Sequence, residues 1–265
     1  MTDYAFEVDK LNCSLDGSHI LHDISFSVKS GERVAIIGRN GAGKTTLLRC
    51  LGRVGVRPSG HICVYGQSLD SYTQKQLARK VSYVPQAGDR ATPFSVREFL
   101  MMARYPHLEP LASPGRRDEE AVHNALIWTH MDAFSDRTME TLSGGERQKV
   151  YIAAALAQQS STLLLDEPTT FLDYGHQVEV LELVERLHRE QGLTVLTVTH
   201  DLNQGPLHCD KVLALKKGSL AYWGEPDDLL SQGILDAIYG TPFDVFPHPR
   251  TGAPLVFPSG GRIQT

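Results

Sequence analysis

The chain has 265 residues, of which 41% are hydrophobic and 22% charged, and its formal net charge is −5 at pH 7. This composition is typical of a globular protein with one large domain or two subdomains that share a core, and it argues against wholesale disorder. The negative charge argues against a general nucleic-acid coat protein, so we expect no nucleic-acid partner.

The cysteines and the apolar segments both argue against a secreted or membrane-spanning chain. The four cysteines are scattered without C-x-x-C spacing, which argues against a disulfide or zinc framework. No apolar run reaches the roughly 18–20 residues that a membrane helix needs. The acidic N-terminus lacks the basic-then-apolar order of a signal peptide. We therefore expect a soluble, cytosolic protein that reaches any membrane process through a partner.

The first part of the chain is expected to form strands that lead into a helix. Residues 24–28 alternate apolar and polar side chains, and residues 33–37 are a short apolar run of the kind found in buried parallel strands. A helix is predicted over residues 45–51. From about residue 86 to residue 158 the chain is expected to be mostly helical. Ser95 and Glu98 have the spacing of a capping box there.

Strand character returns in the second half of the chain. Strands are predicted at residues 162–166, 193–199 and 211–215, with a helix over residues 174–191 between the first two. This alternation predicts a parallel sheet covered by helices, and the inserted helical block predicts two subdomains. Residues 242–265 are rich in Pro and Gly, and we expect them to form an irregular tail.

A glycine-rich segment between the first apolar run and the first helix has the spacing of a phosphate-binding P-loop. Its glycines let backbone amides approach phosphate oxygens, and the helix start adds a positive dipole end. Lys44 is expected to contact the β- and γ-phosphates, and the Thr45 hydroxyl to ligate Mg²⁺. ATP and Mg²⁺ are thus the predicted ligands. The predicted ATP contacts of this segment are Gly38, Arg39, Asn40, Gly41, Ala42, Gly43, Lys44, Thr45 and Thr46.

Two consecutive acids follow the apolar run at residues 163–165. A mere helix cap at a strand end would not need both Asp166 and Glu167 before Pro168. We expect Asp166 to position Mg²⁺ at the nucleotide and Glu167 to polarise the attacking water as the general base. Such a base typically contributes about 10²–10⁴ in rate.

Two further polar residues follow predicted strands. His200 lies beyond the run at residues 193–199, where the C-terminal ends of parallel strands face a ligand crevice. It is expected to bond a γ-phosphate oxygen, although a lone histidine there would more often be structural. Gln86 occupies a comparable position and is expected to ligate Mg²⁺ or to position water.

The segment LSGGERQ at residues 142–148 is a second candidate for phosphate binding. Ser143 and Glu146 have capping-box spacing, and Gly144 and Gly145 expose amides at a helix start. The plain alternative is a well-capped helix. The chain thus carries two phosphate-cradling segments but one pair of acids. If one triphosphate needs both segments, and they cannot meet in one chain, two chains must face each other head to tail with ATP in each seam.

Taken together, these motifs resemble those of ATP-binding-cassette (ABC) ATPases over almost the whole chain. The order matches that family: Walker A at residues 38–45, Q-loop at Gln86, signature at 142–148, Walker B at 163–166, catalytic Glu167, D-loop at 171–173 and switch His200. The resemblance implies an α/β P-loop NTPase fold with a RecA-like core sheet, an antiparallel β subdomain and an inserted helical subdomain. The expected bounds are 1–86 and 159–235 for the nucleotide-binding core, 87–158 for the helical subdomain and 236–265 for the C-terminal tail.

The same resemblance implies a function and partners. In that family ATP closes a dimer, hydrolysis reopens it, and the helical subdomain transmits the motion to transmembrane subunits. A homodimer, integral membrane permease subunits and, indirectly, a periplasmic or surface substrate-binding protein are therefore expected. In that dimer Ser143, Gly144 and Gly145 would contact ATP in trans. The expected location is peripheral, on the cytoplasmic face of the bacterial inner membrane.

Finer features resemble the importer ATPases for ferric siderophores, haem and cobalamin, and most of all the ferric-hydroxamate type. The residues concerned include His176-Gln177, and the segments 51–53, 103–106, 238–242 and 247–249. The resemblance thus implies ferric hydroxamate as cargo, with haem, cobalamin or another siderophore as alternatives. A soluble ABC factor is disfavoured because the chain has neither a second cassette nor a long coiled-coil insertion. A P-loop kinase is disfavoured by the signature and by Glu167.

One position departs from the family pattern. Many members place an aromatic residue before the first glycine-rich turn, where it stacks on adenine. Here Leu15 stands at that position, beside Asp16-Gly17. A leucine packs on a purine without π-stacking, so we expect weaker affinity or a changed base preference.

Overall fold

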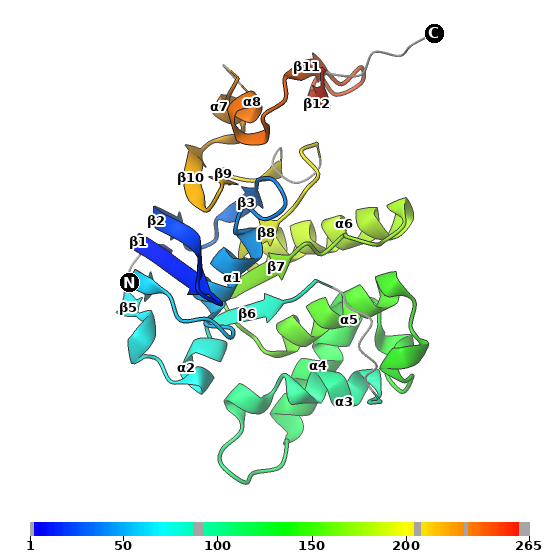
Figure 1. The fold of residues 1–265 in the computed structure, drawn as a ribbon. Coiled ribbons are helices and arrows are strands. Elements are labelled where there is room, and N and C mark those ends of the chain that lie inside the picture. Colours follow the sequence, from blue (N-terminus) through cyan, green and yellow to red (C-terminus); the bar gives the residue numbers. More distant parts are fainter. Residues whose placement is uncertain (1–2, 87–92, 204–207, 231–232, 260–265) are drawn as a thin grey trace. The chain divides into compact units, whose positions relative to one another are not determined.

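The computed structural model describes residues 3–86, 93–203, 208–230 and 233–259 (Figure 1). The chain forms two compact units, which we describe in turn. The first consists of residues 1–66 and 196–265, and the second of residues 67–195. The expected subdomain bounds at residues 86, 158 and 235 stay predictions.

The first unit contains an antiparallel sheet of long strands. Strands β1 (Tyr4–Leu15) and β2 (Ser18–Lys29) form a hairpin, and β4 (Ser59–Val64) pairs with the other edge of β1. The hairpin turn lies at Asp16 and Gly17, whose φ values of 49° and 78° are both left-handed. Asp-Gly suits this type of tight hairpin turn because aspartate tolerates and glycine favours that conformation.

The first unit also holds the strands that carry the P-loop. Strand β3 (Arg33–Ile37) is buried along its whole length and pairs in parallel with β9 (Lys211–Lys216), which pairs antiparallel with β10 (Ser219–Gly224). Strand β8 (Thr194–Val198), which begins in the second unit, is the other neighbour of β3. Helix α1 (Lys44–Gly52) follows the loop after β3.

The C-terminal segment is more ordered than the sequence suggested. It contains helices α7 (Pro226–Leu229) and α8 (Ile234–Tyr239) and an antiparallel hairpin of β11 (Phe243–Pro247) and β12 (Pro254–Pro258). The expectation of an irregular tail over 242–265 was therefore wrong for residues 243–258, while residues 260–265 lie outside the described ranges. Val256 is buried with side chains of α8, β3 and β9, and this apolar packing holds the hairpin in place.

The second unit combines a short parallel strand pair with helices. Strands β6 (Val81–Val84) and β7 (Thr162–Asp166) run in parallel. The longer elements are α3 (Val96–Met102), α4 (Arg116–Trp128), α5 (Gly144–Ala157) and α6 (Tyr174–Gln191). The shorter ones are β5 (Gln67–Ser68), α2 (Gln74–Ala78) and 3₁₀ turns at Leu69–Ser71, Tyr105–His107, Asp132–Phe134 and Met139–Thr141.

Helix α5 is buried on two faces, which fixes its position in the second unit. Val150, Ala153 and Ala157 pack with apolar side chains of α3 and α4. Ile152 and Ala155 pack with side chains of α6 and of the strands β6 and β7. Small residues on both faces let these elements approach closely and hold the C-terminal half of α5 in place.

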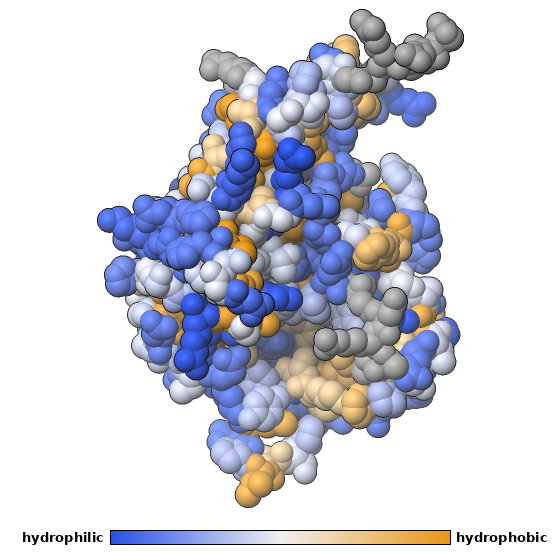
Figure 2. Space-filling model, viewed as in Figure 1, coloured by the Kyte–Doolittle hydropathy of each residue, from blue (hydrophilic) through white to orange (hydrophobic). Residues whose placement is uncertain are grey.

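The surface of the described residues is mixed in character. On the face drawn in Figure 2, hydrophilic residues predominate and hydrophobic ones form several separate groups. Among the helices of the described ranges, none combines the length and the apolar character that crossing a bilayer requires.

Candidate functional site

The P-loop of the first unit is held in a conformation that only glycine permits at two positions. Gly38 has a φ of 141°, and a Cβ there would lie 2.3 Å from the Leu215 carbonyl oxygen. Gly43 has a φ of 100°, and a Cβ there would lie 2.7 Å from Cδ2 of Leu21. The loop backbone is therefore packed directly against β9 and β2, which explains the glycines at this spacing.

The Lys44 side chain binds backbone carbonyls at the start of the P-loop. Its side chain is buried, and Nζ donates to the carbonyl oxygens of Gly38, at 2.9 Å, and Arg39, at 3.3 Å. The positive charge is thus kept next to the loop amides and the start of α1, where an anion is favoured. Thr45 follows in the first turn of α1 and is partly exposed, so the predicted phosphate contacts lie on one continuous loop.

A cavity of about 270 Å³ adjoins the same loop. Its charged lining residues are Arg39, Lys216 and Lys217, so its electrostatic potential favours anions. The hairpin of β9 and β10 supports this region, because the N–H of Gly218 donates to the Ala42 carbonyl oxygen at 3.1 Å. Loop, cavity and hairpin together form a surface suited to a polyphosphate.

Two other predicted residues belong to the first unit. His200 is exposed just after β8, and the N–H of the preceding Thr199 donates to the Ile36 carbonyl oxygen at 3.1 Å. This bond joins the segment that bears His200 to the strand before the P-loop. Leu15 is half-buried at the end of β1, directly before the Asp16-Gly17 turn. Its predicted contact with adenine stays a prediction.

The acids of the second unit lie at the end of β7, as the sequence suggested. Asp166 is buried, and its Oδ2 accepts a hydrogen bond from the Tyr83 hydroxyl at 2.8 Å. Glu167 follows with a φ of 49°, a left-handed conformation that costs a non-glycine residue about 1–3 kcal/mol. Such strain is common at functional sites, and here it falls on the residue predicted to be the general base.

The Glu167 carboxylate is held by two neutral donors. Nε2 of Gln86 lies 3.2 Å from Oε2 of Glu167, and the Thr170 hydroxyl donates to the same oxygen, also at 3.2 Å. The structure thus brings the predicted Gln86 and Glu167 together. Tyr83 and Thr170 were not singled out from the sequence. Tyr83 lies within β6, and Thr170 comes three residues after Glu167. Neither position reveals a contact with a carboxylate from the sequence alone.

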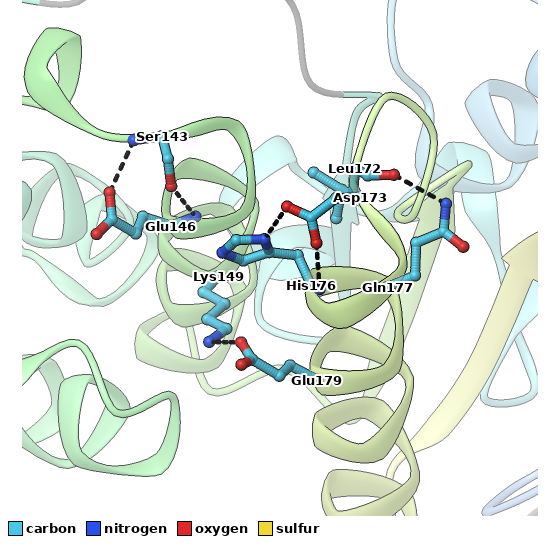
Figure 3. Close-up of polar contacts among 8 residues, drawn as sticks. All are labelled: Ser143, Glu146, Lys149, Leu172, Asp173, His176, Gln177 and Glu179. Atoms are coloured by element: carbon cyan, nitrogen blue, oxygen red, sulfur yellow. Dashed lines mark hydrogen bonds and ion pairs between the residues drawn. The ribbon is translucent and has the colours of Figure 1, made fainter.

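The signature segment forms the N-terminus of α5 with the predicted capping box. The Ser143 hydroxyl accepts from the N–H of Glu146 at 3.2 Å, and Oε2 of Glu146 accepts from the N–H of Ser143 at 2.7 Å (Figure 3). Desolvation raises the pKa of the Glu146 carboxyl, but the hydrogen bonds from Ser143 outweigh it and the net pKa is lowered. Glu146 is therefore charged at neutral pH and keeps the cap formed.

The glycines of this segment differ in exposure. Ser143 and Gly144 are exposed, whereas Gly145 is buried beneath the ring of His176, which lies on α6 (Figure 3). The first amides of a helix have no intrahelical partner, so this end of α5 offers donors for an anion. The sequence pointed to His176 only through the resemblance to importer ATPases. No spacing pattern reveals its contact with Gly145.

Comparison with known proteins places these motifs in a family context. A sequence model described as ABC transporter matches residues 21–170. The petrobactin import ATP-binding protein FpuC of Bacillus anthracis is 40% identical over 226 residues, which cover 85% of this chain and 83% of that protein. The iron(3+)-hydroxamate import ATP-binding protein FhuC of Bacillus subtilis is 35% identical over 236 residues, which cover 89% and 88%.

A solved structure with the same fold comes from a transporter. The chain aligns with a metal-chelate type ABC transporter in an inward-facing conformation with a TM-score of 0.84 and 29% sequence identity. The alignment covers 96% of this chain and 97% of the other. The similarity therefore extends over both units and is not limited to the P-loop.

Proposed function

The chain belongs to the ABC transporter family of ATP-binding proteins, and from this premise we propose that it powers the import of a ferric siderophore. It is an ATPase, and its fold is the ABC ATPase fold predicted from the motifs. The proposal rests mainly on one observation. The chain holds a P-loop, a pair of acids and the LSGGERQ helix start, a combination that an ATP-driven dimer needs.

We assign the steps of hydrolysis to residues whose contacts favour them. A bound triphosphate would replace the Gly38 and Arg39 carbonyls at Nζ of Lys44, since phosphate oxygens are stronger acceptors for an ammonium group. Glu167 would polarise the attacking water, with Gln86 holding one of its oxygens. His200 would donate to the γ-phosphate.

The proposed Mg²⁺ ligands have the oxygen chemistry that this ion prefers. They are the Thr45 hydroxyl, an Asp166 carboxylate oxygen and the Gln86 side-chain oxygen. Nε2 of Gln86 donates to Glu167, so its Oε1 is the side-chain atom that could bind a cation. When bound, Mg²⁺ would neutralise charge on the β- and γ-phosphates.

We place the signature residues in trans. Ser143, Gly144 and Gly145 would contact the triphosphate bound to the P-loop of a second copy, so that ATP closes a homodimer and hydrolysis reopens it. The position of Ser143 and Gly144 supports this arrangement, because both residues are exposed at the start of α5, where the first helical amides have no intrahelical partner.

The proposed partners are integral membrane permease subunits and, indirectly, a periplasmic or surface substrate-binding protein. The chain would then be a peripheral protein of the cytoplasmic face of the bacterial inner membrane. As cargo we propose a ferric hydroxamate. The names of relatives support an iron-siderophore or haem importer in general, and they include petrobactin, hydroxamate and hemin import proteins.

Radiolabelled uptake tests the proposal. Cells that lack the protein would be complemented with wild type or with Glu167→Gln and offered a ferric hydroxamate, a ferric catecholate, labelled haem and, separately, labelled cobalamin. We expect wild type alone to restore hydroxamate uptake. Rescue of another cargo alone would reassign the substrate, and equal rescue by Glu167→Gln would contradict ATP-driven transport. A Glu179→Gln variant is a matched control, because it changes a glutamate of α6 outside the proposed site.

A further inference from the structure

The ring of His176 lies directly on Gly145 of the signature segment. A Cβ added to Gly145 would fall 2.2 Å from Cδ2 and 2.5 Å from Cγ of His176, so no larger residue fits there unless the ring moves. Gly in a helix costs about 1 kcal/mol relative to Ala. The ring of His176 therefore explains why position 145 of α5 is a glycine, whether or not its amide also binds a ligand.

Asp173 fixes the orientation of that ring. Its Oδ1 accepts from the N–H of His176 at 3.0 Å and caps α6, and its Oδ2 lies 2.6 Å from Nδ1 of the same residue. The backbone hydrogen bond from His176, followed by the side-chain one, lowers the pKa of the Asp173 carboxyl. The carboxylate is thus charged at neutral pH, and the imidazole is held at one nitrogen while its carbon edge meets Gly145.

The residues before Asp173 support the neighbouring glycine. A Cβ on Gly144 would lie 3.7 Å from Cδ2 of Leu172, which is ordinary contact. Nε2 of Gln177 donates to the Leu172 carbonyl oxygen at 2.9 Å and so ties this segment to the first turn of α6 (Figure 3). Leu172 thus lies close to Gly144, and His176 lies on Gly145.

The same segment connects the signature to the general base. Glu167 accepts from Thr170, and residues 171–173 follow directly into α6. A shift of the Glu167 segment would displace Leu172 and Asp173, and with them the His176 ring that lies on Gly145. The path is short and lies wholly within the second unit.

Simple helix packing is served by other contacts. One turn further along, Lys149 of α5 forms an ion pair with Glu179 of α6 (Figure 3). Apolar side chains of the two helices pack in one buried cluster. These contacts hold α5 on α6 without His176. Packing of α5 on α6 therefore does not require His176, whose ring is held by Asp173 and lies on Gly145.

We propose that His176 is a positioning residue: held by Asp173, it orients the Gly144 and Gly145 amides toward the triphosphate of a second copy and links that orientation to the Glu167 segment. This inference rests on the proposed function, in which the signature acts in trans. It assigns to His176 a role in the closed dimer, and none in nucleotide binding by the single chain.

The test compares His176→Ala with Glu179→Gln, which breaks the α5–α6 ion pair but leaves His176 and Gly145 intact. Both changes are made in the full-length Glu167→Gln chain. Sedimentation with ATP measures dimer formation, a fluorescent ATP analogue measures binding by the single chain, and thermal unfolding measures stability. We expect His176→Ala to weaken ATP-dependent dimerisation by about tenfold or more, while its nucleotide affinity and unfolding midpoint stay close to those of Glu179→Gln.

Equal dimerisation by the two variants would overturn the inference. Absence of an ATP-dependent dimer in the Glu167→Gln parent would instead overturn the proposed function, and the inference with it. His176→Asn is the conservative variant, because its Cβ, Cγ and two amide atoms stand near the positions of Cβ, Cγ, Nδ1 and Cδ2 of the ring and so keep the contacts with both Asp173 and Gly145. We expect it to dimerise more tightly than His176→Ala. Impairment equal to that of His176→Ala would show that these two contacts do not support the dimer, and would refute the positioning role.

Discussion

The side-chain nitrogen of Gln86 lies 3.2 Å from a carboxylate oxygen of Glu167, so the residue after β6 holds the residue after β7. Gln86 is exposed and Glu167 half-buried, so this contact lies at the surface of the second unit. A partner that moved Gln86 would alter the direction of the proposed general base without touching the P-loop.

We expect Gln86→Ala to lower kcat for ATP hydrolysis by about 10- to 100-fold, because a mispositioned base loses near-attack geometry. KM for ATP should change less than kcat, since the P-loop and the other proposed Mg²⁺ ligands, Thr45 and Asp166, are intact. Phosphate release at several ATP concentrations gives both constants. Thr170→Val removes a second neutral donor, the Thr170 hydroxyl, to the same Glu167 oxygen and serves as the comparison. A kcat for Gln86→Ala within twofold of wild type would rule out a positioning role for Gln86.

Leu15→Tyr should tighten ATP binding by up to about tenfold, because an aromatic ring adds roughly 0.5–1.5 kcal/mol of stacking energy. Leu15→Met keeps the apolar volume without a ring and should bind like wild type. Titration with a fluorescent ATP analogue compares the three chains. Unchanged affinity of Leu15→Tyr would show that Leu15 does not face the adenine.

Helix α4 begins at a buried ion pair whose loss should destabilise the second unit. Nε of Arg104 lies 2.9 Å from Oδ1 of Asp118, and Oδ2 accepts from the N–H of Gly115. The Gly115 hydrogen bond, opposed by desolvation and aided by Arg104, lowers the pKa of Asp118 below its ordinary value of 3.8. We expect Asp118→Asn to cost about 3–5 kcal/mol of unfolding free energy at pH 7, because it leaves Arg104 buried without its counter-charge.

The pH dependence of that cost follows from the sign of the shift. A carboxyl with a lowered pKa stabilises the folded chain fully above its unfolded pKa and loses this effect as pH falls through the folded pKa. Denaturant unfolding should therefore give the same difference between wild type and Asp118→Asn at pH 7 and pH 5, and a smaller one below 3.8. Glu120→Gln, in the exposed Arg116–Glu120 pair, should cost under about 1 kcal/mol. An equally small cost for Asp118→Asn would contradict this account.

Gln148 is a buried polar residue of α5 whose side-chain amide makes no hydrogen bond to any described residue. Gln148→Met keeps a similar shape and removes the unpaired polar group, so we expect it to stabilise the chain by about 1–3 kcal/mol. Gln177→Met is the control, because it removes a side chain that donates to Leu172 and should not stabilise. Thermal unfolding distinguishes them. A lower unfolding midpoint for Gln148→Met would mean that the amide is satisfied in the folded chain.

Local signals were enough to predict much of the fold. The capping boxes at Ser95 and Ser143 are present as expected, because each depends on residues three apart in one turn. The hairpin of β11 and β12 was missed, since Pro and Gly usually mark irregular segments. Its prolines at 247, 254 and 258 stand at strand ends, so no interior ladder bond is lost.

The candidate site shows the limit of local reasoning more clearly. Glycine and lysine spacing predicted the P-loop, because the loop is continuous in sequence. The bonds from Tyr83 to Asp166 and from Gln86 to Glu167 join segments more than 80 residues apart. The contact of His176 with Gly145 likewise depends on how α5 packs on α6. Such contacts follow from tertiary packing and leave no spacing pattern.

If ATP is hydrolysed at a site shared by two copies of the chain, two variants that are inactive alone should restore hydrolysis when they are mixed. Lys44→Ala removes the P-loop lysine, and Ser143→Arg blocks the signature. A mixed dimer would pair the intact P-loop of one variant with the intact signature of the other. We predict that each variant alone releases no phosphate from ATP and that the mixture does. If the mixture remains as inactive as its components while both variants are folded, the shared site is contradicted.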